Sequence, residues 1–259
     1  MKIKNLILPV CYALSLTACQ GFPLHWGSPP KDPQAEAMLA SQDYQGAMRR
    51  FQLLAQTQSS PDHYWLLAAD AALRGGDGVS AQNMVYNVRA AELSQEDRTH
   101  YLLLTSRLDL NAGRAKDAVT KLNAVDAQKL GKTDAINYHT LRASALNQQG
   151  DMLGSARERV ALGGLLTQRD SVESNNEAIF DALKRLPDAA LSRQQSPPDV
   201  LSGWMSLTQI LRGSSPSELA EAMEQWRLRY PSHPAATAAF LQARLAKIPA
   251  ARKDKPGVS

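Results

Sequence analysis

The sequence predicts an all-α protein made of successive helical hairpins that stack into a solenoid. Three observations support this prediction. Alanine, leucine, glutamine and arginine are abundant and favour helix, whereas β-branched residues are few. A pattern of apolar and small residues recurs every 37 positions between residues 64 and 162. Capped and proline-initiated helical segments then continue to residue 246.

The first residues have the pattern of a bacterial export signal. Two lysines within residues 1–4 precede a mostly apolar stretch of about eleven residues, which is too short to span a bilayer as a permanent helix. The stretch ends in Leu16-Thr17-Ala18-Cys19, which resembles the lipobox of bacterial lipoproteins. The resemblance implies a signal peptide at 1–18 and lipidation of Cys19. The alternative is an ordinary secretory signal with an incidental cysteine.

The surroundings of Cys19 extend this prediction. Cys11 lies in the segment that would be removed, so the mature chain would hold one lipidated cysteine and no disulfide. Several acyl chains anchor a protein stably, whereas one does not. The next residue is Gln20, and an aspartate there would resemble an inner-membrane retention signal. We therefore expect an outer-membrane lipoprotein that faces the periplasm.

The charge balance argues against a nucleic-acid partner. The chain has 29 lysines and arginines against 25 acidic residues, and removal of residues 1–18 takes away Lys2 and Lys4, so the net charge falls from +4 to +2. Such a balanced surface creates no strong electrostatic field. Four prolines and two glycines predict a lipidated tether at 19–34. A helical domain is expected at 35–247 and a basic flexible tail at 248–259.

Six columns of residues define the 37-residue repeat. They are Tyr64/Tyr101/Tyr138, Leu67/Leu104/Leu141, Ala71/Leu108/Ala145, Gly76/Gly113/Gly150, Ala81/Ala118/Ser155 and Val88/Val125/Leu162. The first three columns form one apolar stripe on a first helix. The glycine column predicts a left-handed turn, and the small residue five positions later lets a second helix approach the first. This pattern resembles a tetratricopeptide repeat lengthened from its usual 34 residues. Ala47, Phe51 and Leu54 indicate an incomplete earlier copy.

Helices continue after the repeats fade. An apolar face predicts a helix at 175–186, and a second helix is expected at 199–211. Ser215-Pro216-Ser217-Glu218 is a capping box that opens a helix ending before Pro231. A last helix is expected at 234–246. The total is about ten to twelve helices in antiparallel pairs, which would form a curved solenoid.

No residue pattern favours an enzyme. Ser28-Pro29-Pro30-Lys31 matches the Ser-x-x-Lys of penicillin-recognising enzymes, but two prolines prevent the helical geometry that this chemistry needs. The glycine-rich segment 74–78 lacks the Gly-Lys-Ser/Thr of a phosphate-binding loop, and the repeat explains it as a turn. We predict no catalytic residues, no cofactor and no small-molecule substrate.

Histidines and aromatic residues allow two binding-site alternatives. His63 and His100 share a repeat column and His139 lies near the next equivalent position, so stacking could create a metal site. Because the sequence shows no carboxylate or thiol neighbours at ligand spacing, partly buried interface histidines and no metal are predicted. Trp65, Trp204, Trp226 and the tyrosine column are predicted to be core, and the alternative is a peptide-binding groove.

Three stretches resemble the amino-terminal domain of the penicillin-binding-protein activator lipoproteins (LpoA). They are Asn175-Asn176-x-x-Ile179-Phe180-x-x-Leu183, Gly203-Trp204-x-x-Leu207 and Trp226-x-x-Arg229-Tyr230-Pro231-x-x-Pro234. The resemblance covers most of residues 19–245. It implies a non-enzymatic outer-membrane scaffold that regulates peptidoglycan synthesis by a class A penicillin-binding protein.

Members of this family continue into a second α/β domain, to which the resemblance assigns the activating contact. Since this sequence stops at Ser259, a truncated or split activator is expected. The alternative function is a tetratricopeptide lipoprotein accessory of an envelope assembly machine, such as a type IV pilus pilotin or an outer-membrane-protein assembly factor.

Overall fold

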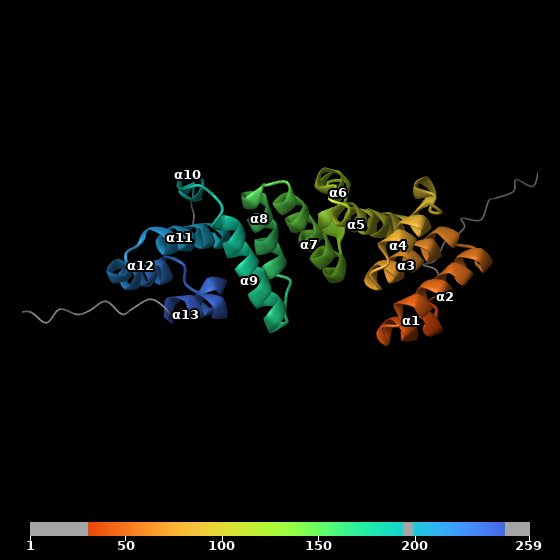
Figure 1. The fold of residues 1–259 in the computed structure, drawn as a ribbon, viewed down its shortest axis with the longest axis horizontal. Coiled ribbons are helices and arrows are strands. Elements are labelled where there is room, and N and C mark those ends of the chain that lie inside the picture. Colours follow the sequence, from red (N-terminus) through yellow and green to blue (C-terminus); the bar gives the residue numbers. More distant parts are fainter. Residues whose placement is uncertain (1–30, 194–198, 247–259) are drawn as a thin grey trace, which may run out of the picture. The chain divides into compact units, whose positions relative to one another are not determined.

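The computed structural model describes residues 31–193 and 199–246, and every regular element in these ranges is helical (Figure 1). The α-helices are α1 (Pro33–Ala40), α2 (Tyr44–Thr57), α3 (Pro61–Arg74), α4 (Gly78–Val85), α5 (Gln95–Asn111), α6 (Ala115–Leu122), α7 (Lys132–Gln148), α8 (Met152–Gly163), α9 (Arg169–Leu183), α10 (Asp188–Leu191), α11 (Val200–Gly213), α12 (Pro216–Arg229) and α13 (Ala239–Ala246). Three 3-10 turns lie at Ala90–Glu92, Ala127–Lys129 and Pro234–Thr237. The all-α prediction is confirmed.

Several predictions fall on residues outside the described ranges. These are the signal peptide at 1–18, the lipidation of Cys19, most of the tether at 19–34 and the tail at 248–259. Within the described ranges, no helix has the length and apolar character that a bilayer-spanning segment needs.

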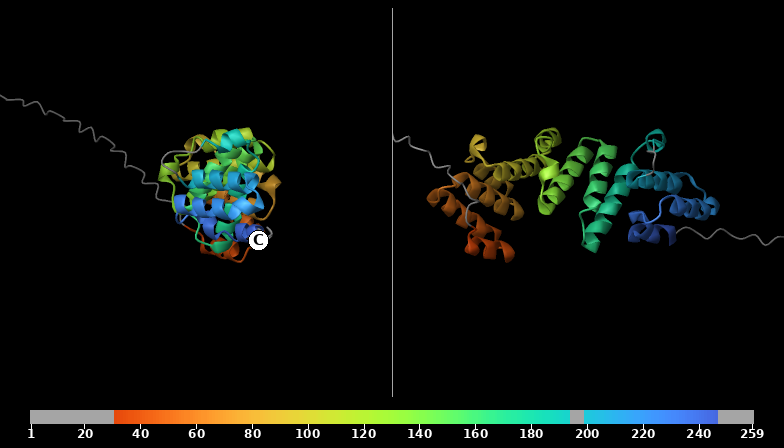
Figure 2. Two further views of the ribbon diagram at one scale, coloured as in Figure 1. Left: turned by 90° about the vertical axis from the view of Figure 1, so that its left-hand side faces the viewer. Right: turned by 180° about the vertical axis from the view of Figure 1, so that it is seen from behind.

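The repeats form consecutive helical hairpins (Figures 1 and 2). Helix α3 packs on α4, α5 on α6, and α7 on α8, as the 37-residue period predicts. The first helices of neighbouring hairpins also contact each other, since α3 packs on α5 and α5 on α7. The repeats therefore align one face of α3, α5 and α7 along the stack.

The glycine column closes each hairpin as predicted. Gly76, Gly113 and Gly150 have φ angles of +81°, +74° and +85°. No heavy atom lies within 4 Å of a Cβ built at any of them, so the left-handed backbone and not a lack of space requires glycine. In two of the turns the following aspartate caps the second helix. The Asp77 carboxylate accepts from the Ser80 backbone, and the Asp151 carboxylate does so from Gly154.

Replacing Gly113 with valine is expected to lower the free energy of unfolding by about 1–3 kcal/mol, because a β-branched residue resists a positive φ. Urea denaturation followed by circular dichroism measures this change. Gly78→Ala is the matched control, because Gly78 begins α4 in ordinary helical backbone with open space around it. The control is expected to leave stability unchanged or slightly raised. Equal stability of Gly113→Val and the parent protein would contradict the repeat register.

The close approach of the paired helices depends on two columns of small residues, of which sequence analysis found one. The predicted column is Ala81, Ala118 and Ser155; the one that sequence analysis missed is Ala69, Ser106 and Ala143. All six side chains are at most 1% exposed. The Ser155 hydroxyl donates to the Ala143 carbonyl at 2.8 Å, and the Ser106 hydroxyl donates to the Ala118 carbonyl at 3.4 Å. Each buried hydroxyl is thus satisfied by the backbone of the opposing helix.

Some helix boundaries differ from the prediction. Helix α1 begins at Pro33, two residues before the expected domain start, because Asp32 caps it by accepting from the Ala35 backbone at 2.8 Å. Helix α9 begins at Arg169 and not at 175. The last predicted helix, 234–246, is divided into a 3-10 turn and α13, because Ala238 between them has extended backbone. The capping box at Ser215 and the end of α12 before Pro231 are confirmed.

The three family-like stretches converge in one core at the carboxyl-terminal end of the described chain. This core contains Ile179, Phe180, Leu183, Trp204, Leu207, Trp226 and Tyr230. The Trp226 indole donates to the Gly203 carbonyl at 2.8 Å. A Cβ at Gly203 would lie within 2.6 Å of two atoms of the His233 ring. Only glycine therefore allows the His233 ring to pack this closely against α11. The motifs are therefore packing motifs.

His233 lies among the aromatic rings of this core, although no pattern in the sequence indicated it. Its ring is 5% exposed and lies edge-on to the rings of Trp204 and Trp226. Nε2–H donates to the Val200 carbonyl at 2.8 Å, while Nδ1 accepts from the Ala235 backbone at 3.1 Å. Both ring nitrogens are satisfied only in the neutral form. Burial lowers the pKa of His233 below the ordinary value of 6.5, although the hydrogen bond to Val200 opposes this shift.

The protein is expected to lose stability as the pH falls below about 6.5. Above that pH, His233 is neutral in both the folded and the unfolded state. Below it, the unfolded chain takes up a proton that the folded core excludes, so the free energy of unfolding decreases toward the lower pKa of the folded state. His100, whose pKa burial also lowers, acts in the same direction. Urea denaturation from about pH 8 to pH 5 measures this change. Stability that rises as the pH falls through this range would contradict the neutral His233 core.

Candidate functional site: a groove along the first helices

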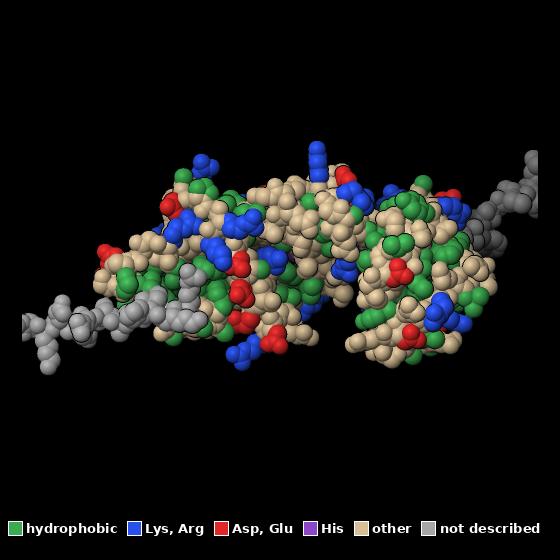
Figure 3. Space-filling view, viewed as in Figure 1, with side chains coloured by type: hydrophobic (Ala, Val, Ile, Leu, Met, Phe, Trp, Pro, Cys, Tyr) green, Lys and Arg blue, Asp and Glu red, His purple; other side chains and the backbone are tan. Residues whose placement is uncertain are grey.

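A cavity of about 400 Å³ lies along the first helices of the hairpins. Its walls come mainly from α1, α3, α5 and α7, and the surface is hollowed between α1 and α7 (Figure 3). We call this cavity the first-helix groove. Most of its lining follows the repeat, because the same helix positions recur every 37 residues. The recurring pairs and triplets are Glu96/Thr133, Asp97/Asp134, His63/His100/Asn137, Leu67/Leu104/Leu141 and Asp70/Arg107.

The groove combines an apolar floor with an acidic rim. Leucines from all four helices line it: Leu39, Leu67, Leu103, Leu104 and Leu141. Five carboxylates and two arginines also line it: Glu36, Asp70, Glu96, Asp97, Asp134, Arg74 and Arg107. Carboxylates therefore outnumber arginines in this lining by five to two.

Some of these charges are paired within the groove wall. The Arg74 guanidinium lies 2.7 Å from the Asp70 carboxylate, so these two charges largely offset each other. In contrast, Glu36, Glu96 and Asp134 are exposed, and within the described chain their carboxylates have no ion pair or side-chain hydrogen bond except with solvent. These three carboxylates are available to a partner.

His63 and His100 are partly buried in the groove wall. His63 Nδ1 lies 2.7 Å from an Asp97 oxygen. Burial raises the pKa of Asp97, but hydrogen bonds from His63 and Ser94 and the charge of His63 outweigh it and hold the pKa below its ordinary value. Burial lowers the pKa of His100 against the opposing influence of Asp70 and Asp97. Asp97 is therefore ionised and His100 neutral at neutral pH.

The structure corrects the sequence argument about the histidines. Carboxylate neighbours do exist, because His63 contacts Asp97 and His139 Nδ1 lies 2.8 Å from Glu158. These carboxylates are 34 and 19 positions away in the chain, so sequence spacing within one helix could not show them. His139 is not part of the groove lining. Across the described ranges, no three histidine, cysteine or acidic side chains are grouped as metal ligands.

The prediction that the aromatic residues belong to the core is confirmed for two tryptophans and two tyrosines. Trp204, Trp226, Tyr64 and Tyr138 are all at most 7% exposed. Trp65 is partly buried against the first core. No tryptophan or tyrosine lines the first-helix groove, so the alternative of an aromatic groove is wrong for this cavity.

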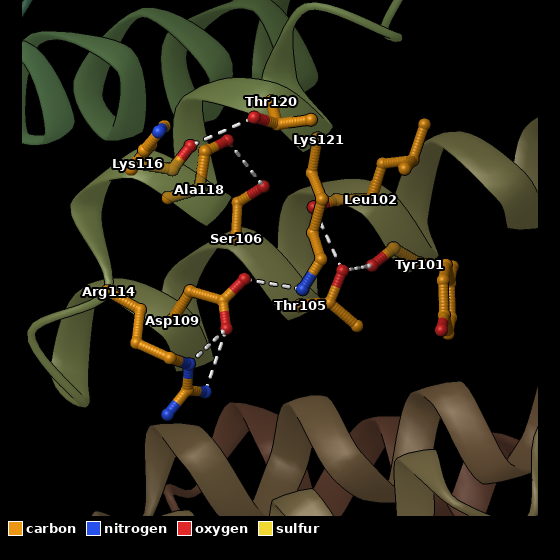
Figure 4. A network of polar contacts seen from close by, with 10 residues as sticks. All are labelled: Tyr101, Leu102, Thr105, Ser106, Asp109, Arg114, Lys116, Ala118, Thr120 and Lys121. Atoms are coloured by element: carbon orange, nitrogen blue, oxygen red, sulfur yellow. Dashed lines mark hydrogen bonds and ion pairs between the residues drawn. The ribbon is translucent and has the colours of Figure 1, made fainter.

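A second polar cluster lies in the hairpin of α5 and α6 (Figure 4). Asp109 is 4% exposed and occupies the repeat position of Ala72 and Leu146. Its carboxylate accepts two hydrogen bonds from Arg114, at 2.7 and 3.0 Å, and also pairs with Lys121. Arg114 stands where the other repeats have the capping aspartate, and α6 has no side-chain cap. The cluster thus fixes this turn by an ion pair in place of a cap, and we assign it a structural role.

Comparison with known proteins places the chain in a family. The family model described as LppC putative lipoprotein matches residues 34–256. The chain belongs to this family. Among its curated relatives is the penicillin-binding protein activator LpoA of Edwardsiella ictaluri, 30% identical over 244 residues that cover 91% of this chain and 34% of that protein. The LpoA of Glaesserella parasuis is 25% identical over 238 residues that cover 90% of this chain and 39% of that protein.

Solved structures support the fold of this LppC-family chain. The crystal structure of the E. coli LpoA amino-terminal domain is similar with a TM-score of 0.64 at 20% identity, covering 85% of this chain and 99% of that one. The Haemophilus influenzae LpoA amino-terminal domain matches with a TM-score of 0.61 at 21% identity, covering 81% and 94%. The resemblance to this amino-terminal domain is therefore confirmed. The chain spans between about a third and two fifths of the length of these two curated relatives.

Proposed function

We propose that this chain is the partner-binding helical domain of an outer-membrane lipoprotein that regulates peptidoglycan synthesis by a class A penicillin-binding protein. The observation that carries the proposal is the similarity over about nine tenths of the chain to proteins named penicillin-binding protein activators. The domain would act as a non-enzymatic scaffold. Its hairpins align one face of successive first helices, and the first-helix groove on that face is open to a partner.

Lipidation of Cys19 would anchor this scaffold in the outer membrane. The lipobox-like sequence at 16–19 and the membership in a family of putative lipoproteins support this part of the proposal. The same scheme assigns 1–18 to the signal peptide, 19–32 to the tether, 33–247 to the helical domain, because α1 begins at Pro33, and 248–259 to the tail.

A combined binding and activity assay tests the proposal. The full chain, purified in detergent, is passed over an immobilised class A penicillin-binding protein from the same organism, and lipid II polymerisation by that synthase is measured with and without the chain. We expect saturable binding without faster polymerisation, because the family resemblance assigns the activating contact to a second domain. Absence of binding would overturn the proposed partner. Saturable stimulation would show that the helical domain itself carries the activating surface.

A further inference from the structure

We infer that the first-helix groove is a docking site for a lysine- or arginine-bearing segment of the partner protein, an inference that rests on the proposed function as a partner-binding domain. Helices of several hairpins build the groove jointly. Its position on the repeat-aligned face distinguishes it from an incidental hollow between two helices.

The charges of the groove select a cationic occupant. Glu36 on α1, Glu96 on α5 and Asp134 on α7 present carboxylates from three different helices, and none of the three is neutralised within the described chain. The arginine of the nearest ion pair, Arg74, is already engaged by Asp70. An anionic segment would meet like charges along the rim, and this repulsion costs binding free energy.

The apolar floor favours lysine or arginine over a small inorganic cation. Leu67, Leu104 and Leu141 line the groove at the same position on three successive first helices. The methylene stems of lysine and arginine pack on leucine side chains while their charged ends reach the exposed carboxylates. A bare divalent cation gains nothing from leucine and prefers several oxygen ligands at one point.

The dimensions of the groove suit a short peptide segment. Axes of packed helices lie about 8–10 Å apart, so the distance from α3 to α7 is about 20 Å, which about six extended residues span. A segment with two or three basic residues would therefore meet the unpaired carboxylates of Glu96 on α5 and Asp134 on α7. Arg107 on α5 also lines the groove and would repel a basic side chain from its own position, so it would limit where the basic residues of the segment can lie.

A peptide-binding experiment tests this inference with the full chain in detergent. Fluorescence anisotropy is measured with a labelled nonapeptide that alternates lysine and alanine, and with its glutamate–alanine counterpart. We expect saturable binding of the lysine peptide alone, weakening as salt rises from about 50 to about 500 mM. The groove variant, Glu36→Gln with Glu96→Gln and Asp134→Asn, is expected to bind about tenfold more weakly.

A matched variant controls for net charge. Asp117→Asn with Glu177→Gln and Glu221→Gln removes three exposed carboxylates that lie outside the groove, and it is expected to bind within about twofold of the parent. Equal losses in both variants would overturn the inference, and so would binding of the glutamate peptide. Displacement of the lysine peptide by millimolar Mg²⁺ at constant ionic strength would identify a divalent-cation site and would also overturn it.

The same variants separate this inference from the proposed function. If the parent protein and the groove variant bind the immobilised synthase equally and neither binds the lysine peptide, the inference fails and the proposed partner stands. If the lysine peptide binds with the expected variant effects and no class A synthase does, the chemistry of the groove stands and the proposed partner is wrong.

Discussion

Replacing Trp226 with alanine is expected to lower the free energy of unfolding of the carboxyl-terminal helices by about 3–5 kcal/mol. The side chain is 2% exposed, its ring lies against His233 and Tyr230, and its indole N–H donates to Gly203. The substitution would remove all of these contacts and leave a cavity between α11 and α12. Because neighbouring units of a repeat protein can unfold separately, the effect is measured by hydrogen exchange of individual helices.

Trp226→Phe is the control for this prediction. It keeps an aromatic ring in the core and loses the hydrogen bond to Gly203, so a smaller loss of about 1 kcal/mol from the bond is expected in addition to a small packing change. Exchange in α3 to α6 is expected to stay unchanged in both variants, because these helices belong to other core clusters. Equal exchange in α11 of the alanine variant and the parent would show that the three family-like stretches do not form one core.

Replacing Cys19 with serine is expected to abolish the association of the protein with the outer membrane. Serine lacks the thiol that receives the diacylglycerol. The expected products are a soluble periplasmic protein or an uncleaved precursor. Membrane fractionation and mass spectrometry of the purified amino terminus measure both.

Cys11→Ser is the control for the anchor, because that cysteine lies in the segment predicted to be removed. It is expected to leave both fractionation and the mass of the mature protein unchanged. Outer-membrane association of Cys19→Ser at the level of the parent protein, with cleavage still before residue 19, would refute lipidation at this cysteine.

The 37-residue period predicted the hairpins because particular backbone conformations and helix contacts require particular residue types. A left-handed turn needs glycine, and a close helix crossing needs a small side chain, so Gly76, Gly113, Gly150 and one small-residue column were found in the sequence. The opposing column at 69, 106 and 143 has the same period but was missed, because alanine and serine are common in helices and stand out only once a partner helix is known.

The groove and the ion pairs could not be predicted in the same way. The contact of His63 with Asp97 and that of His139 with Glu158 each join two different helices. Which helix faces meet in such contacts depends on how the helices pack against one another. Asp109 had no counterpart in the other repeats, so no column indicated it. His233 is buried because tryptophans from two helices surround it. The family-like motifs specify both tryptophans but do not specify His233, so they did not indicate its position.

In-cell crosslinking from the groove is the most direct test of the central claim that this domain docks a peptidoglycan synthase. A photoreactive amino acid is placed at Asn137, which lines the groove, and in a parallel strain at Val79, which is exposed and outside it. Crosslinked products are identified by mass spectrometry. The account predicts a class A penicillin-binding protein as the main product from Asn137 and its absence from Val79. A component of another envelope assembly machine as the main product from Asn137 would contradict it.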